Sequence, residues 1–136
     1  MQNYIKSQTR LAFVQYIFQN EFISTDSLES IEDFQKHFYD TYIDIIDEKK
    51  EIKLKFNKNF LNKLFSSLKN NIHKKNITED LNGFIDINRR FEKWDNILKS
   101  IIFAIIAELL ITEKNKFKIV FNDYLNTVSY THLRAH

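Results

Sequence analysis

The stretch WDNILKSIIFAIIAELL, residues 94–110, decides the fold class of this chain. Asp95 stands at a helix N-cap position, and apolar residues then occupy most sides of a helical wheel: Ile97, Leu98, Ile101, Ile102, Ala104, Ile105, Leu109 and Leu110. A helix that is apolar nearly all round is usually the central one of a bundle, so this stretch predicts a buried helix surrounded by others. Its carboxylate, Glu108, is predicted to pair with a lysine or to cap a loop backbone, with a perturbed acid as the alternative.

The segments on either side of this stretch also keep a helical period. Within residues 2–22, the apolar residues Leu11, Val14, Phe18 and Phe22 recur at spacings of three and four. Further helices are predicted over about 28–46, from about residue 59 to 71, over about 77–85 and from about residue 119. Together these segments predict an all-α fold, a compact helical bundle of about six helices.

Local signals add detail to these helices. Asp26 with Glu29, and Asn76 with Glu79, have the spacing of helix start signals. Gly83, the single glycine of the chain, is predicted to lie inside the fourth helix, where close packing would justify its cost. The β-branched residues near 119 would also suit a strand, but the sequence offers no second strand for pairing, so a helix is predicted.

Composition excludes several classes of function. The 136 residues are 43% hydrophobic and 28% charged, which is typical of one globular domain. The absence of cysteine excludes thiolate chemistry, and a chain with one glycine and no proline has no glycine-rich phosphate loop. His37 and His73 have no further ligand at metal-binding spacing, and no serine has the context of a catalytic nucleophile. The sequence therefore predicts a protein without a cofactor, a metal or a catalytic site.

Charge and hydropathy bear on partners and location. Twenty Lys and Arg against 18 Asp and Glu give a net charge of +2, lower than is usual for a dedicated nucleic-acid binder. No apolar run begins the chain as a signal peptide would, and the longest run, 101–107, is far shorter than the roughly 20 residues that span a bilayer. A cytoplasmic protein that does not enter membranes is expected.

Three blocks of the sequence resemble the NusB family of bacterial transcription antitermination factors. They are RLAFVQYIFQ (10–19), WDNILKSIIFAIIAELL (94–110) and FKIVFNDY (117–124), whose order and separation also fit that family over residues 5–128. The resemblance implies a NusB-like RNA-binding helical domain over residues 1–128. It also implies that the chain pairs with the ribosomal protein NusE, binds boxA-type single-stranded RNA of ribosomal RNA leader transcripts, and joins the antitermination complex of RNA polymerase.

Roles for individual residues follow from that resemblance. Lys6 and Arg10 would face RNA phosphates, and Lys99 and Lys118 match basic positions of the family. Phe18 would lie towards NusE. Asn122 and Asp123 would either contact a partner or tie down the preceding loop.

The chain departs from the family pattern at its two ends. Lys6 and Arg10 stand where members typically open with a cluster of arginines, and Lys116 stands where a proline is usual. From the resemblance we expect that the final family helix is missing, which predicts exposed apolar surface and marginal stability. Residues 129–136 form a tail that looks non-native and matches nothing in the family.

Three hypotheses for function remain open at this point. The first is an antitermination factor that acts with NusE on boxA-type RNA. The second is the RNA-binding module of a ribosomal RNA methyltransferase. The third is a helical protein-interaction or dimerisation module without RNA binding, which the thin basic patch favours.

Overall fold

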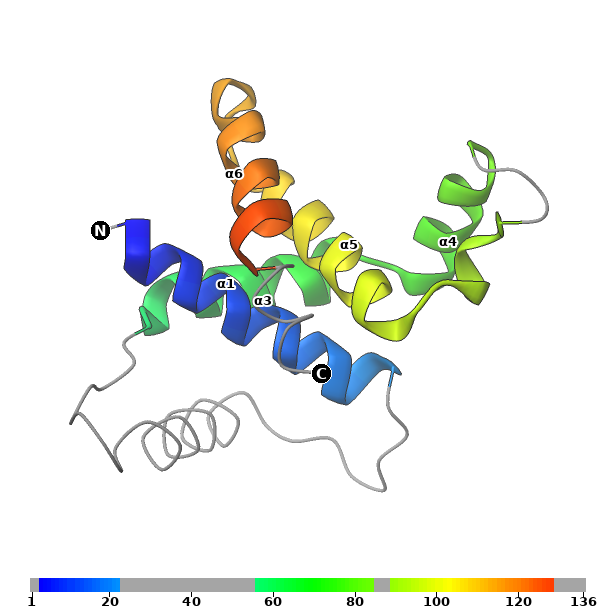
Figure 1. Cartoon of the computed structure of the whole chain (residues 1–136), viewed down its shortest axis with the longest axis horizontal. Helices are drawn as coiled ribbons and strands as arrows, with labels where there is room; N and C mark the ends of the chain where they lie inside the picture. The colour runs from blue at the N-terminus through cyan, green and yellow to red at the C-terminus, as the bar shows by residue number, and fades with distance from the viewer. Residues whose placement is uncertain (1–2, 23–55, 85–88, 129–136) are drawn as a thin grey trace.

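Every regular element that the structure describes is helical (Figure 1). The structure is a computed structural model and describes residues 3–22, 56–84 and 89–128. The α-helices in these ranges are α1 (Asn3–Ile17), α3 (Lys58–Asn71), α4 (Lys74–Asn82), α5 (Asn96–Leu109) and α6 (Phe117–Asp123). The prediction of an all-α helical bundle is confirmed. The helix predicted over 28–46, with its start signal at Asp26 and Glu29, lies outside the described residues.

Helices α1, α3 and α5 pack against one another and form the core. The aromatic rings of Phe13 and Phe65 meet edge to face, with 5.7 Å between their centroids, where α1 lies on α3. Figure 1 shows α4 at one end of the molecule and α6 rising above α1, towards the N-terminal side. The side chains from the three central helices that are fully or almost fully buried include Phe13, Val14, Ile17, Leu61, Leu64, Ile101, Phe103 and Ala104.

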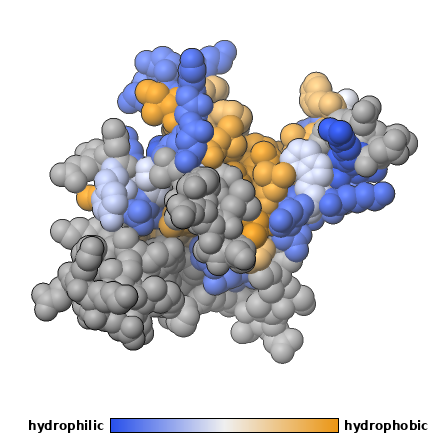
Figure 2. Space-filling view, in the orientation of Figure 1, coloured by the Kyte–Doolittle hydropathy of each residue, from blue (hydrophilic) through white to orange (hydrophobic). Residues whose placement is uncertain are grey.

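Helix α5 begins where the sequence predicts, and its packing explains its composition. The Asp95 side chain accepts a hydrogen bond from the backbone N–H of Ile97 at 2.9 Å, which confirms the predicted cap. The helix contacts α1, α3 and α6, in agreement with a central position. One stripe nevertheless stays partly exposed: Leu98, Ile102, Ile106 and Leu109. Figure 2 shows this as hydrophobic surface that runs along α5.

The start of α3 is tied to α1. Asn57 is the N-cap residue, and its side-chain oxygen accepts from the backbone N–H of Phe60 at 2.8 Å. The backbone N–H of Asn57 donates to Thr9 Oγ1 at 2.9 Å. These two bonds fix the entry of α3 against the buried side of α1.

The structure corrects two predictions for the fourth helix. The start signal at Asn76 is wrong, because α4 begins at Lys74 and the backbone N–H of Ile77 already bonds the carbonyl of His73. Gly83 does not lie inside the helix but is its C-cap residue, with φ −65°. A Cβ at position 83 would lie 3.2 Å from the carbonyl oxygen of Asp80, so a larger residue would require a shift of a few tenths of an ångström there.

The helix predicted from residue 119 is α6, but it begins two residues earlier, at Phe117. It follows a 3₁₀ turn, η4 (Lys114–Lys116), and continues as a π-helical turn, η5 (Tyr124–Val128), which packs on α1. Among the described helices, none combines the length and the apolar character needed to cross a membrane.

Candidate functional site

A buried polar network joins α1, α5 and the end of α6. The guanidinium of Arg10 donates from Nε and Nη2 to the two carboxylate oxygens of Glu108, with distances of 2.8 Å and 2.6 Å. Its Nη1 lies 2.6 Å from Asp123 Oδ2. Tyr124 Oη donates to Glu108 at 2.8 Å, and Ser7 Oγ donates to Asp123 at 2.8 Å. Side chains from residues more than 100 positions apart in the sequence therefore share one set of hydrogen bonds.

The central charged pair of this network, Arg10 and Glu108, is buried, so burial and the interactions within the network set the pKa values of Arg10 and Tyr124. The Arg10 and Glu108 side chains are 7% and 3% exposed, so neither charge is stabilised by water. Burial by itself lowers the pKa of the Arg10 guanidinium, but the hydrogen bonds and charge of Glu108, with help from Asp123, outweigh it and hold the pKa above its ordinary value. The pKa of Tyr124 is raised well above its ordinary value because the phenol is buried and faces the negative charge of Glu108. Arg10 thus stays charged and Tyr124 stays a neutral donor at physiological pH.

The partner of Glu108 differs from the predicted one. Glu108 pairs with an arginine, not with a lysine, and it accepts from side chains and not from a loop backbone. The physical reason is geometric, because two parallel N–H groups of a guanidinium match the two oxygens of a carboxylate, which an ammonium group does not.

Arg10 is placed differently from the phosphate-facing position that the resemblance implies. All three of its nitrogens are bonded to Glu108 or Asp123, and the residue is 6% exposed. The bonds that a phosphate would use are therefore already made inside the protein. Two carboxylates against one guanidinium also leave this cluster with a net negative charge, which disfavours a phosphate beside it.

The three predicted lysine contacts lie on three different helices. Lys6 is partly exposed on α1, Lys118 is exposed at the start of α6, and Lys99 lies near the start of α5, where its Nζ donates to the carbonyl of Glu92 at 3.1 Å. Helix α5 and η4 separate Lys99 from Lys118, and α5 alone spans about 15 Å between Lys99 and its end. The structure does not bring these two lysines together into one patch.

The predicted partner-binding residues also separate. Phe18 begins the π-helical turn η1 (Phe18–Phe22) and is packed, partly buried, against the core. Asn122 is exposed on α6, whereas Asp123 is bonded to Ser7 and Arg10. Asp123 therefore ties α6 to α1 instead of tying down the loop before it.

A cationic surface lies on α3, outside the three sequence blocks that resemble the NusB family. We call it the α3 cationic face; its exposed members are Lys58, Asn59, Asn62, Lys63, Ser66, Lys69 and Asn70. The signal that points to it in the sequence is a run from Ile52 to Thr78 that contains no Asp or Glu and holds Lys53, Lys55, Lys58, Lys63, Lys69, Lys74 and Lys75. A long run of cations without an acid is a better sign of an anion-binding surface than total lysine content.

Possible metal ligands and known relatives are two further sources of functional information. In the ranges that the structure describes, no three His, Asp or Glu side chains are grouped so that they could hold a metal ion. No family model, no curated protein and no solved structure matches this chain.

Proposed function

We propose that this chain is an RNA-binding protein that acts without catalysis, as a divergent member of the NusB type. In this proposal it binds boxA-type single-stranded RNA together with the ribosomal protein NusE and takes part in transcription antitermination in the bacterial cytoplasm. The observation that carries the proposal is the buried network of Arg10, Glu108, Asp123 and Tyr124.

The network supports the proposal because its members come from the three blocks that resemble the family. Arg10 lies in the first block, Glu108 in the second, and Asp123 and Tyr124 in the third. A buried arginine is tolerated only with its carboxylate partners, so a chain that folds in this way needs all three blocks at once. The resemblance thus rests on residues that depend on one another physically, not on three unrelated similarities.

The charges that face solvent also favour an RNA partner. Over the described residues, exposed lysines and arginines outnumber exposed carboxylates, although the whole chain carries a net charge of only +2. Two of the carboxylates in these ranges, Glu108 and Asp123, are occupied by Arg10. The surface that the described residues form is therefore more cationic than the composition of the whole chain indicates.

A second candidate function is a protein-interaction module without RNA binding, and the apolar stripe of α5 favours it. Leu98 is 39% exposed, and the stripe continues into Leu110 and Ile111, which are 56% and 45% exposed. Exposed apolar residues in a row are typical of surfaces that another protein covers. Within the first proposal, this stripe is the part of the molecule best suited to a protein partner such as NusE.

Fluorescence anisotropy on a labelled boxA-type RNA tests the proposal. The full chain is titrated with and without purified NusE, at about 50 and about 200 mM KCl. We expect binding that is tight only when NusE is present and that weakens at the higher salt concentration, because few phosphate contacts come from this chain alone. Absence of binding under all four conditions would leave the protein-interaction module as the better explanation.

A matched pair of variants tests the residues that the resemblance implies. Lys6→Gln/Lys118→Gln is expected to weaken RNA binding in the presence of NusE, whereas Lys93→Gln/Lys114→Gln removes the same charge elsewhere and should not. Arg10 is left intact in this experiment, since its removal would disturb the fold and not only the surface. An equal loss of RNA affinity in both variants would show a general effect of charge. It would count against Lys6 and Lys118 as specific RNA contacts.

A further inference from the structure

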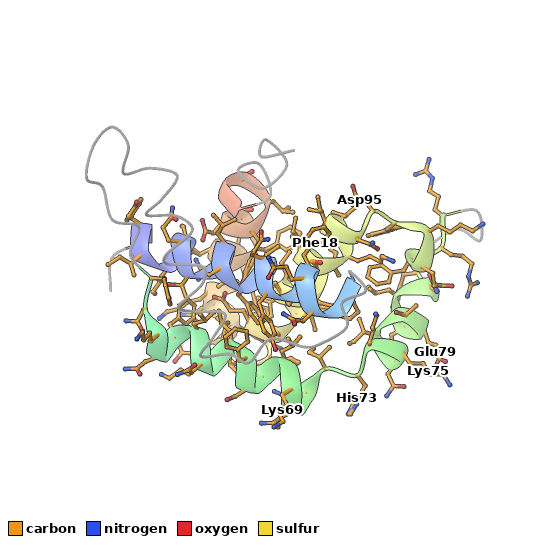
Figure 3. All side chains as sticks on the ribbon, turned by 90° about the horizontal axis from the view of Figure 1, so that it is seen from below. Phe18, Lys69, His73, Lys75, Glu79 and Asp95 are labelled. Carbon is orange, nitrogen blue, oxygen red and sulfur yellow. The ribbon has the colours of Figure 1, made fainter. Side chains whose placement is uncertain are left out.

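The outer side of α3 is one continuous polar surface. At 100° per residue, the α3 cationic face covers an arc of about 140° on the helix, and Leu61, Leu64 and Phe65 fill the opposite side, buried in the core. Lys58 and Lys69 are eleven residues apart and so lie on the same line of the helix, about 16 Å from each other along its axis. Figure 3 shows Lys69 pointing outward, and His73 and Lys75 beyond the end of α3 pointing outward along the same edge.

The charges on this face have no internal partner in the part of the chain that the structure describes. Lys58, Lys63 and Lys69 form no ion pair there, and α3 itself contains no acidic residue. Lys58 lies in the first turn of α3, where a cation is unfavourable because the helix dipole is positive at that end. Helix stability therefore does not explain its presence, whereas an anion bound from outside would offset the unfavourable position.

A groove beside the face supplies hydrogen-bonding groups. It is a shallow groove open to solvent, with a volume of about 490 Å³. It is lined by Asn62, Lys63, Ser66 and Asn70 of the α3 cationic face, by Ser67 and Asn71 of the same helix, and by Ile111 from the segment after α5. Its floor is fixed, because Ser67 donates to the carbonyl of Ala107 at 2.6 Å and so joins α3 to α5. Amide and hydroxyl groups donate to and accept from phosphate and ribose oxygens. Among the described residues that line this groove, none has an aromatic ring on which a base could stack.

We propose that the α3 cationic face and its groove hold the sugar–phosphate backbone of single-stranded RNA. The inference rests on the proposed function, RNA binding, and specifies a contact surface other than the ends of α1 and α6. A face one helix wide, with about 16 Å between its outer lysines, suits a strand of a few nucleotides. The contacts are to the backbone, so this surface adds affinity and not sequence preference.

The salt dependence of binding tests this surface directly. Binding of the full chain with NusE to a labelled boxA-type RNA is measured over a series of salt concentrations. The face variant is Lys58→Gln/Lys63→Gln/Lys69→Gln. The control variant, Lys93→Gln/Lys114→Gln/Lys116→Gln, removes three exposed cations from other elements. Each lost phosphate contact lowers the slope of log K against log salt by about 0.7 for single strands, so the face variant should lose about 2 from its slope. The control should keep the wild-type slope.

The possible failures are distinguishable. If the wild type binds the RNA and the two triple variants have equal slopes of log K against log salt, the α3 cationic face is not an RNA contact. The proposed function would then remain intact. Absence of binding by the wild type with NusE would overturn both. The melting temperatures of the variants are compared first, because the three α3 lysines are exposed and their loss should not alter the core.

Two competitors decide which polyanion the face accepts. Single-stranded DNA of the same sequence should compete less well than the RNA, because the Asn and Ser groups of the groove can contact the ribose 2′-OH. Polyglutamate should compete poorly, since it lacks both ribose and phosphate. Equal competition by the DNA or by polyglutamate would overturn RNA as the occupant of this surface.

Discussion

Arg10 is held by aromatic rings as well as by carboxylates. Its guanidinium carbon lies 5.6 Å from the centroid of the Phe60 ring and 5.8 Å from that of the Tyr124 ring. A planar cation between rings gains from their negative faces, and the bidentate bond to Glu108 fixes its orientation. The side chain of Arg10 therefore links its own helix, α1, to three further elements: α3, α5 and the end of α6.

The first prediction concerns the loss of this cation. Arg10→Met should destabilise the protein by about 3–5 kcal/mol, because Glu108 would keep a buried charge without its partner. Arg10→Met/Glu108→Gln removes both charges of that pair and should cost less than the sum of the two single variants. Urea unfolding of the wild type, Arg10→Met, Glu108→Gln and the double variant measures the coupling free energy between the two residues. Additive costs would show that the two residues do not stabilise each other.

The second prediction concerns pH. The folded protein keeps Tyr124 protonated above pH 10 because burial and Glu108 raise its pKa, whereas the unfolded chain releases that proton near pH 10. The unfolded state then binds fewer protons, so stability falls as pH rises, by about 1.4 kcal/mol per pH unit from this residue. Tyr124→Phe lacks this dependence. The free energy of unfolding, measured from pH 8 to pH 11, should therefore differ less between wild type and variant as pH rises; a constant difference would contradict the argument.

At the scale of the element, the sequence predicts helices well where the signal is local. The cap at Asp95 and the apolar period of α5 follow from neighbours in the sequence, and the structure has both. The start of α4 is different, because Asn76 and Glu79 have the right spacing but the helix is already hydrogen-bonded one turn earlier. A capping motif indicates where a helix is able to start. The residues before the motif decide whether the helix starts there or earlier.

The third prediction tests the cap of α5. Asp95→Ala should destabilise the protein by about 1 kcal/mol, because the backbone N–H of Ile97 loses its acceptor at the start of the central helix. Asp95→Asn is the matched control, since its amide oxygen accepts the same bond, and it should cost only a few tenths of that. Thermal unfolding followed by circular dichroism measures both. Equal losses would show that the carboxylate acts through its charge and not through the cap.

The candidate site is the part that local reasoning could not predict. The residues of the network are visible in the sequence as Arg10, Glu108 and Asp123, but their pairing spans 98 and 113 residues. A side chain on an amphipathic helix gives no sign of whether it faces water or a distant carboxylate. The α3 cationic face was predictable in principle, because the run without acids from 52 to 78 is local, but the low net charge of the chain hides it.

At the scale of the whole molecule, apolar surface remains exposed on one side. The α5 stripe and the outer residues of α6 are exposed, with Ile119 at 68% and Phe121 at 43%. Figure 2 shows hydrophobic surface on both helices. In the described residues, α5 and α6 are therefore the elements that carry this apolar surface.

The fourth prediction is self-association through this side of the molecule. Sedimentation velocity on the wild type should show assemblies that grow with protein concentration, and Leu98→Gln/Ile119→Gln should reduce them without lowering the melting temperature. Phe84→Gln is the control, because Phe84 is 91% exposed at the end of α4 and lies outside this surface. A monomer at all concentrations, or equal effects of the two variants, would contradict the prediction.

The long span of the buried network also has a consequence during synthesis. Arg10 leaves the ribosome 98 residues before Glu108 and 113 before Asp123. At about 5–20 residues per second, translation takes about 5–20 s to supply the first of these partners. Helix α1 therefore spends that interval with a charge that only water can solvate, so its docking into the core must follow the synthesis of α5. The nascent chain is most exposed to proteases and chaperones in this interval, and slower translation would prolong it.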